Sequence, residues 1–234
     1  MDLAARSRRL IALLHKETAL VVALLLMVAG IWAFAEITDE VLEDEAVIDA
    51  AVMDWVHGAG GDPRGPRWLE VTALDLTALG GAPVLALMIA LIAGFLAMTK
   101  QYREAVLVLV ASLLGLGLST VLKEVFSRER PQEGVQMAEA FTASFPSGHT
   151  MLSTVIYLTL GAILSATRPR RRERFYIIAA AVLIAGIVGL TRVYLGVHFP
   201  TDVLAGWSVG LAWTVLCLIV AHKLHPRPAD DAGR

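Results

Sequence analysis

The sequence predicts an all-α integral membrane protein: a bundle of six transmembrane helices, with an amphipathic extracytoplasmic helical segment between the first two spans. Two observations predict this class. Hydrophobic residues make up 56% of the 234-residue chain and charged residues only 18%, against about 25% charged residues in typical soluble domains. Asp, Glu, Lys and Arg are also absent from six windows of 17 to 19 residues, at 19–35, 81–99, 105–122, 150–167, 175–191 and 203–221.

Each of these windows is long enough to cross a membrane. A helix rises about 1.5 Å per residue, so roughly 17–25 apolar residues cross the hydrocarbon layer. The buried helices of a soluble bundle do not require charge-free runs of this length. We therefore predict six spans within a single membrane-embedded domain, residues 1–234.

Overall charge and cysteine content exclude several classes of protein. The net charge of −2 gives no basis for nucleic-acid binding. The high hydrophobicity excludes a disordered chain. The single cysteine, Cys217, excludes an intramolecular disulfide and a cysteine-based zinc site.

The distribution of basic residues predicts the orientation in the membrane. If the six windows span, 14 Lys and Arg residues lie on the side of both termini and 6 lie on the opposite side. Lys and Arg concentrate in the cytoplasmic loops of membrane proteins. We therefore expect both termini to be cytoplasmic.

The longest connection, Glu36–Gly80, contains 11 acidic residues. Apolar residues between Val41 and Val56 recur at roughly helical spacing, which predicts an amphipathic helix lying at the outer surface. The sequence Asp62-Pro63-Arg64-Gly65-Pro66 ends this helix, and Arg67–Leu79 has the pattern of a second helical stretch. This segment could shape the route of a lipid to the site, form a lid, or only pack against the bundle.

Polar residues that could bind a ligand or take part in catalysis lie at the ends of four predicted spans. The topology brings the end of the third span, the start of the fourth, the end of the fifth and the start of the sixth to the outer face. The candidate residues at these ends are Lys123, Arg130, Ser147, Gly148, His149, Arg192, His198 and Asp202.

The cations of this set predict a phosphate site. Lys123, Arg130 and Arg192 at a membrane boundary are costly unless they are paired or solvated, and arginine offers phosphate a bidentate fork. Ser147 and Gly148 precede a predicted helix, whose N-terminal amides favour an anion. Arg128 lies nearby and could assist, but we assign it no role from the sequence.

The histidines predict the reaction. A neutral imidazole can attack phosphorus and form a covalent intermediate. Asp202 follows His198 by four residues, so the two meet if a helix begins near Pro200. A carboxylate on one ring nitrogen fixes the tautomer and direction of the ring. His149 is then the candidate acid that protonates the leaving oxygen.

Taken together, these residues resemble the motifs of the type 2 phosphatidic acid phosphatase family, which is similar in its core to vanadium-dependent haloperoxidases. Lysine, six residues and Arg-Pro match Lys123 to Arg130-Pro131, and Pro-Ser-Gly-His matches Pro146 to His149. Ser-Arg, five residues, His, three residues and Asp match Thr191-Arg192 to His198 and Asp202, with threonine in place of serine.

The resemblance implies a phosphatase that needs no metal or other cofactor. It implies that His198 is the nucleophile, that Asp202 orients it and that His149 is the general acid. Lys123, Arg130, Ser147, Gly148 and Arg192 are implied to hold the phosphate. The short chain resembles bacterial members of the inner membrane, which act on lipid phosphates such as phosphatidylglycerol phosphate, phosphatidic acid or undecaprenyl diphosphate. The sequence does not choose among these lipids, nor does it give an oligomeric state.

Three other functions are compatible with a cationic site at a membrane boundary. A lipid or anion transporter, or a flippase, could use it without hydrolysis, although transporters tend to place ionisable residues near the midplane. Haloperoxidase-like chemistry on bound vanadate is a second alternative, and a catalytically silent lipid-binding protein is a third. In the sixth span, Gly206 and Gly210 favour close helix packing within the bundle over dimerisation.

Overall fold

A computed structural model describes residues 3–43, 46–57, 62–131 and 142–224, with side chains from residue 17 onward. The described residues form helices and no strands, which confirms the predicted all-α class. The elements are α1 (Leu3–Leu42), α2 (Val47–Val56), α3 (Arg67–Thr77), a 3-10 turn η1 (Ala78–Gly80), α4 (Ala82–Met98), α5 (Tyr102–Phe126), α6 (Gly148–Ala166), α7 (Arg171–Tyr194) and α8 (Pro200–Leu224).

Each predicted span coincides with a helix, and none extends more than one residue beyond the helix ends. Among the described residues, five helices are long and apolar enough to cross a membrane: α1 from Glu17 onward, α5, α6, α7 and α8. The sixth, α4, has 17 residues and qualifies together with the α3–η1 segment before it, from which it bends by 45°. Its Leu87, Leu91 and Phe95 repeat every four residues and are 62–65% exposed, as expected of a face that contacts lipid. The chain is therefore a multi-pass membrane protein.

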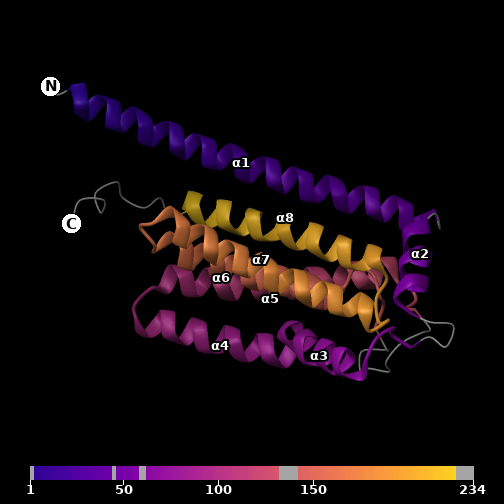
Figure 1. Ribbon diagram of the computed structural model, residues 1–234. Helices are drawn as coiled ribbons and strands as arrows, with labels where there is room; N and C mark the ends of the chain where they lie inside the picture. The colour runs from indigo at the N-terminus through magenta and orange to yellow at the C-terminus, as the bar shows by residue number, and fades with distance from the viewer. Residues whose placement is uncertain (1–2, 44–45, 58–61, 132–141, 225–234) are drawn as a thin grey trace.

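Helices α6, α7 and α8 form the centre of the bundle (Figure 1). α6 packs against both α7 and α8, while α1 runs along the outer side of α8. α5 packs against α6, and α4 lies against α5. The four helix ends with the candidate residues therefore meet at one end of the bundle, on the right of Figure 1.

Two glycines let α8 approach the first turns of α6. A Cβ at Gly206 would lie 2.9 Å from the carbonyl oxygen of Ser147. A Cβ at Gly210 would lie 2.9 Å from the carbonyl oxygen of Met151 and 2.9 Å from the Cβ of Thr154. The predicted packing of this glycine pair within the bundle is confirmed.

The segment between the first two spans differs from its prediction. α1 continues to Leu42, so Val41 belongs to the first span and the separate helix begins only at Val47. α2 packs against α8 and α7, with Asp49 and Met53 buried, so it does not simply lie on the outer surface. An amphipathic pattern shows which face is covered but not what covers it, and here that face meets protein.

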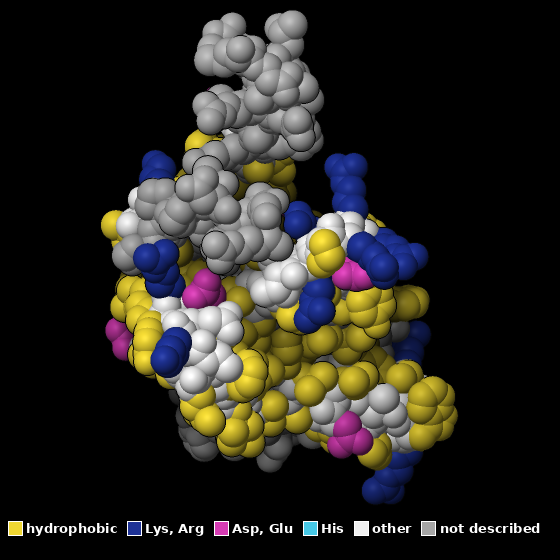
Figure 2. All heavy atoms as spheres, turned by 90° about the vertical axis from the view of Figure 1, so that its left-hand side faces the viewer, with side chains coloured by type: hydrophobic (Ala, Val, Ile, Leu, Met, Phe, Trp, Pro, Cys, Tyr) yellow, Lys and Arg dark blue, Asp and Glu magenta, His cyan; other side chains and the backbone are white. Residues whose placement is uncertain are grey.

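Basic side chains mark the end of the bundle opposite the candidate residues. Figure 2 looks onto this end and shows Lys and Arg side chains at many points of it. They come from the α4–α5 turn, the α6–α7 turn and the end of α8: Lys100, Arg103, Arg168, Arg170, Arg171, Arg172, Arg174 and Lys223.

The contact between α6 and α8 predicts a difference between two glycines. Gly210→Ala forces a Cβ against backbone and side-chain atoms of α6, and overpacking of this kind costs about 1–3 kcal/mol. Gly117→Ala in α5 is the matched control, because a Cβ there meets no atom within 4 Å. We expect G210A to lower the melting temperature in detergent and G117A to leave it unchanged or raise it. Equal melting temperatures for the two variants would contradict the close α6–α8 contact.

Candidate functional site

His198 lies between a carboxylate and a guanidinium group. Its Nδ1 is 3.2 Å from Oδ2 of Asp202, and its Nε2 is 3.2 Å from NH1 of Arg130. Arginine can only donate, so Nε2 accepts and Nδ1 carries the proton that is donated to Asp202. The tautomer is therefore set from both sides, with the lone pair on Nε2.

Burial keeps the imidazole of His198 neutral. The side chain is 1% exposed, and burial lowers the pKa of His198 to about 3. The Asp202 carboxylate opposes this shift, whereas the charges of Arg130 and Arg192 add to it. At neutral pH, His198 thus has the protonation state that a nucleophile requires.

Arg130 is held at this point by several acceptors. Its Nε donates to the carbonyl of Thr142 at 2.9 Å, and NH2 donates to the hydroxyl of the same residue at 3.0 Å. NH1 also donates to the carbonyl of Val197 at 2.9 Å. The arginine therefore joins the segment after α5 to the segment that contains His198.

The Pro-Ser-Gly-His segment is anchored at the start of α6. Phe145 is fully buried, with its ring 5.9 Å from Phe34 of α1 and 5.2 Å from Phe126 of α5. The hydroxyl of Ser147 accepts from Thr150 at 2.9 Å. The backbone N–H of Ser147 donates to the carbonyl of Asp202 at 3.0 Å.

One detail of the predicted phosphate site therefore changes. The amide of Ser147 connects α6 to α8 in this structure, whereas the sequence suggested an amide aimed at the anion. Gly148 begins α6, where backbone amides have no acceptor within the helix. A Cβ on Gly148 would lie 3.4 Å from Cε of Lys123, so the lysine stem runs beside this helix start. The ammonium of Lys123 donates to the carbonyl of Ala143.

Arg192 and His149 face the segment that joins the first two spans. Arg192 is fully buried, and its NH1 donates to the hydroxyl of Thr77 at 3.2 Å. His149 is half-buried at the second residue of α6, and a Cβ at Gly80 would lie 3.4 Å from its Cδ2. The α3–η1 region thus lines this side of the candidate site.

Sequence reasoning missed Asp49 and Thr201 near Asp202, and it named Arg128 only as a residue that could assist phosphate binding. Arg128 donates to Oδ1 of Asp202 at 2.7 Å and to Oδ2 of Asp49 at 2.8 Å. Thr201 donates to Asp49 through its backbone N–H and its hydroxyl. Arg128 lies within the first motif and Thr201 directly precedes Asp202 of the third, but neither position indicates a contact with Asp49, which lies outside all three motifs.

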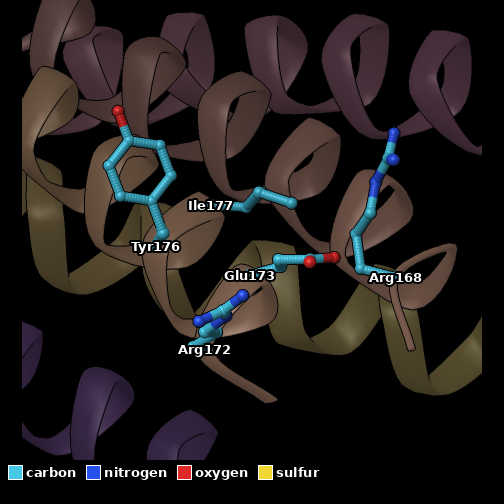
Figure 3. Close-up of a pocket in the computed structure, with 5 residues that line it drawn as sticks. All are labelled: Arg168, Arg172, Glu173, Tyr176 and Ile177. Carbon is cyan, nitrogen blue, oxygen red and sulfur yellow. The ribbon is translucent and has the colours of Figure 1, made fainter. Parts of the chain in front are cut away.

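A surface pocket of about 430 Å³ lies at the opposite, basic end, between the end of α6 and the start of α7 (Figure 3). Arg168, Arg172, Glu173, Tyr176 and Ile177 line it. In Figure 3 the guanidinium groups of Arg168 and Arg172 lie on different sides of Glu173 and do not converge. The pocket contains none of the predicted site residues, and its arginines fit the topological role expected of this loop.

Residues 104–226 match the model of the PAP2 superfamily. The chain belongs to this family. It is 36% identical over 171 residues to phosphatidylglycerophosphatase B of Bacillus subtilis, covering 72% of this chain and 78% of that protein. It is 31% identical over 118 residues to an undecaprenyl-diphosphatase of Sulfolobus acidocaldarius, covering 47% of this chain and 52% of that protein.

The fold has a solved counterpart. The crystal structure of a transmembrane PAP2-type phosphatidylglycerolphosphate phosphatase from Bacillus subtilis superposes with a TM-score of 0.72 at 30% identity, covering 88% of this chain and 98% of that one. All three matches are named as phosphatases. The predicted family and hydrolase class are thereby confirmed, and none of the three favours the transporter alternative.

The low pKa of His198 predicts how stability depends on pH. The unfolded chain binds a proton at His198 below about pH 6.5, whereas the folded chain does so only near pH 3. Folding stability therefore falls as pH drops from about 6.5 toward 3, by up to about 1.4 kcal/mol per pH unit. We expect His198→Asn to show a shallower loss of melting temperature than wild type between pH 6.5 and 4.5.

Exposed His222, near the end of α8, provides the control. His222→Asn removes a histidine that remains in water after folding, so its melting profile should follow wild type. If H198N and wild type lose stability equally as pH falls, His198 is not held neutral by burial.

Proposed function

We propose that this protein is a multi-pass phosphatase of the bacterial inner membrane that hydrolyses a lipid phosphate at the extracytoplasmic face through a phosphohistidine on His198. The observation that supports this best is the pair of contacts to His198, with the Asp202 carboxylate at Nδ1 and the Arg130 guanidinium at Nε2. A carboxylate there holds the proton on Nδ1, and a cation next to Nε2 marks where an anion binds.

Binding begins with the exchange of acceptors on Arg130. A phosphate oxygen carries charge and is a stronger acceptor than a neutral imidazole nitrogen. We infer that NH1 of Arg130 moves onto the phosphate, which frees the lone pair of Nε2. Lys123, Arg192, the Ser147 hydroxyl and the Gly148 amide are the further donors that we assign to the phosphate oxygens, which gain charge-stabilising contacts before the reaction starts.

In the first chemical step, Nε2 of His198 attacks phosphorus, and the bond between phosphorus and the leaving oxygen breaks. His149 gives its proton to the departing oxygen, so a lipid alcohol leaves as a neutral group. His198, now bonded to phosphorus, keeps its Nδ1 proton hydrogen-bonded to Asp202. The positive charge that develops on the ring is stabilised by this carboxylate.

In the second step, water attacks phosphorus and the bond between phosphorus and Nε2 breaks. His149, which lost its proton in the first step, accepts one from the water. Inorganic phosphate leaves, and both histidines return to their starting states. Asp202 accepts hydrogen bonds throughout and never needs to become protonated.

The substrate class that we propose is a phosphomonoester or diphosphate of a membrane lipid. The relatives named above include a phosphatidylglycerophosphatase and an undecaprenyl-diphosphatase. Phosphatidylglycerol phosphate, phosphatidic acid and undecaprenyl diphosphate therefore form the panel to test. A site at the end of the bundle lets a head group reach the histidines while its chains stay in the bilayer.

The proposed orientation rests on the distribution of charge between the two ends. The end opposite His198 carries the Lys and Arg residues of the α4–α5 and α6–α7 turns (Figure 2). Positive residues remain on the cytoplasmic side during insertion. Both termini are therefore proposed to be cytoplasmic and the site extracytoplasmic.

Phosphate release from the lipid panel tests the function. Purified protein in detergent with EDTA should release phosphate from at least one of the three lipids. His198→Ala should reduce turnover by about 1,000-fold or more, because the nucleophile is lost. His222→Ala, at the far end of α8, is the matched control and should retain wild-type turnover. Wild-type activity in H198A would remove His198 as nucleophile, and loss in EDTA restored by magnesium would contradict the metal-independent mechanism.

Labelling of single cysteines tests the orientation. In a Cys217→Ala background, a membrane-impermeant thiol reagent should label Asp54→Cys of α2 in intact spheroplasts. The reagent should label Thr167→Cys, at the α6–α7 turn, only after lysis. Both native side chains are exposed, so each cysteine is accessible from its own side. The reverse pattern would invert the proposed topology.

A further inference from the structure

Arg128 sits between two carboxylates on different helices. NH1 donates to Oδ1 of Asp202 at 2.7 Å and to the hydroxyl of Thr201 at 2.9 Å, while NH2 donates to Oδ2 of Asp49 at 2.8 Å. Its Cζ lies 4.3 Å from the centre of the Phe199 ring. Both amino groups of the guanidinium are therefore occupied by acceptors of the protein.

The two carboxylates are more buried than the arginine that joins them. The side chains of Asp49 and Asp202 are 5% and 0% exposed, and that of Arg128 is 20% exposed. Burial alone lowers the pKa of Arg128, but the charges of Asp202 and Asp49 outweigh burial and raise it. Arg128 therefore stays charged, and it is a cation that pairs with both of these buried carboxylates.

Asp49 also stabilises the start of α8 from a different helix. Its Oδ1 accepts the backbone N–H of Thr201 at 2.9 Å, and Oδ2 accepts the Thr201 hydroxyl at 2.6 Å. Thr201 is the second residue of α8, where amides lack acceptors within the helix and negative charge is favoured. α2 thus supplies the cap for the turn of α8 that contains Asp202.

The second oxygen of the Asp202 carboxylate, Oδ2, faces the residues directly before α8. Oδ2 accepts from Nδ1 of His198 at 3.2 Å and from the backbone N–H of Phe199 at 3.0 Å. With Oδ1 bonded to Arg128, the carboxylate is fixed at both oxygens. Movement of Arg128 or Asp49 would therefore rotate Asp202 and change the hydrogen bond that orients His198.

We propose that Arg128 and Asp49 are positioning residues, which act on the reaction through Asp202 and do not contact the substrate. This inference rests on the phosphatase function proposed above. The charge of Arg128 stabilises the ionised form of Asp202, so that the carboxylate accepts a hydrogen bond from Nδ1–H of His198 and does not take the proton. Asp49 holds Arg128 and the first turn of α8 in register.

The test compares arginine substitutions at opposite ends of the bundle. Arg128→Gln removes the cation beside Asp202, and Arg170→Gln is the matched control, because Arg170 is 65% exposed and pairs with Glu173. Turnover is measured on whichever lipid of the panel wild type hydrolyses fastest. Partners that orient metal-ligating histidines typically affect affinity or activity 10–100-fold, and we expect an effect of similar size here. We expect R128Q to lower kcat by about 10- to 100-fold with KM within about threefold, and R170Q to match wild type.

The melting temperature of R128Q shows whether this variant folds. If it does not fold, two milder variants still test the proposal. Asp49→Asn keeps an oxygen for the Thr201 amide but loses the charge, and it should lower kcat in the same direction by a smaller factor. Arg128→Lys keeps the charge without the planar fork, so its kcat should fall between those of wild type and R128Q. A raised KM with unchanged kcat in these variants would instead make Arg128 a phosphate ligand and overturn the proposal.

An activity-independent measurement separates this inference from the proposed function. The charged groups around His198 are Asp202, Arg130 and Arg192, with Arg128 beyond Asp202. Losing the Arg128 charge should raise the pKa of His198, as seen by NMR of protein labelled with ¹⁵N-histidine and assigned with H198N. If the His198 titration is shifted in R128Q but wild type hydrolyses none of the lipids, the proposed function is refuted and the positioning role is supported. Titrations of R128Q and D49N that match R170Q would refute the positioning role.

Discussion

The buried carboxylate of Asp202 is the group on which the rest of the site depends. Removing an ionised carboxylate from water costs several kcal/mol unless opposite charge and hydrogen bonds compensate. Here the compensation comes from Nδ1 of His198, the backbone N–H of Phe199 and the guanidinium of Arg128. The contacts that make this burial tolerable also fix the direction and tautomer of the histidine.

The same residue links the helices that surround it. The backbone carbonyl of Asp202 accepts the amide of Ser147, so the start of α6 is fixed relative to the start of α8. Gly206, one turn further along α8, leaves room for the carbonyl of Ser147. The close packing of α6 against α8 and the hydrogen bond between their first turns therefore depend on each other. A shift of one helix relative to the other would break both.

The sequence allowed prediction of much of the fold and of the residues nearest to His198. Spans follow from charge-free windows, because lipid tolerates few exposed charges at any position of a crossing helix. Asp202 and His198 meet because Asp202, in the first turn of α8, reaches back past the helix start to the backbone N–H of Phe199 and to Nδ1 of His198. No such short-range rule relates Asp49 to Thr201, which are 152 positions apart, or Thr77 to Arg192. The connection between the first two spans contains 11 acidic residues, and periodicity does not indicate which of them is buried against protein.

The connection between the first two spans lines one side of the site, and it lies outside the residues that the family model matches. The family model matches residues 104–226, whereas Asp49 and Thr77 lie before this range. Asp49 caps α8 and holds Arg128, and Thr77 accepts from the buried Arg192. The part of the chain from α5 onward supplies both histidines, but half-buried Arg128 and fully buried Arg192 donate to acceptors in α2 and α3. A change in the sequence of this segment can therefore alter the position of the arginines, and with them the site, without altering any motif residue.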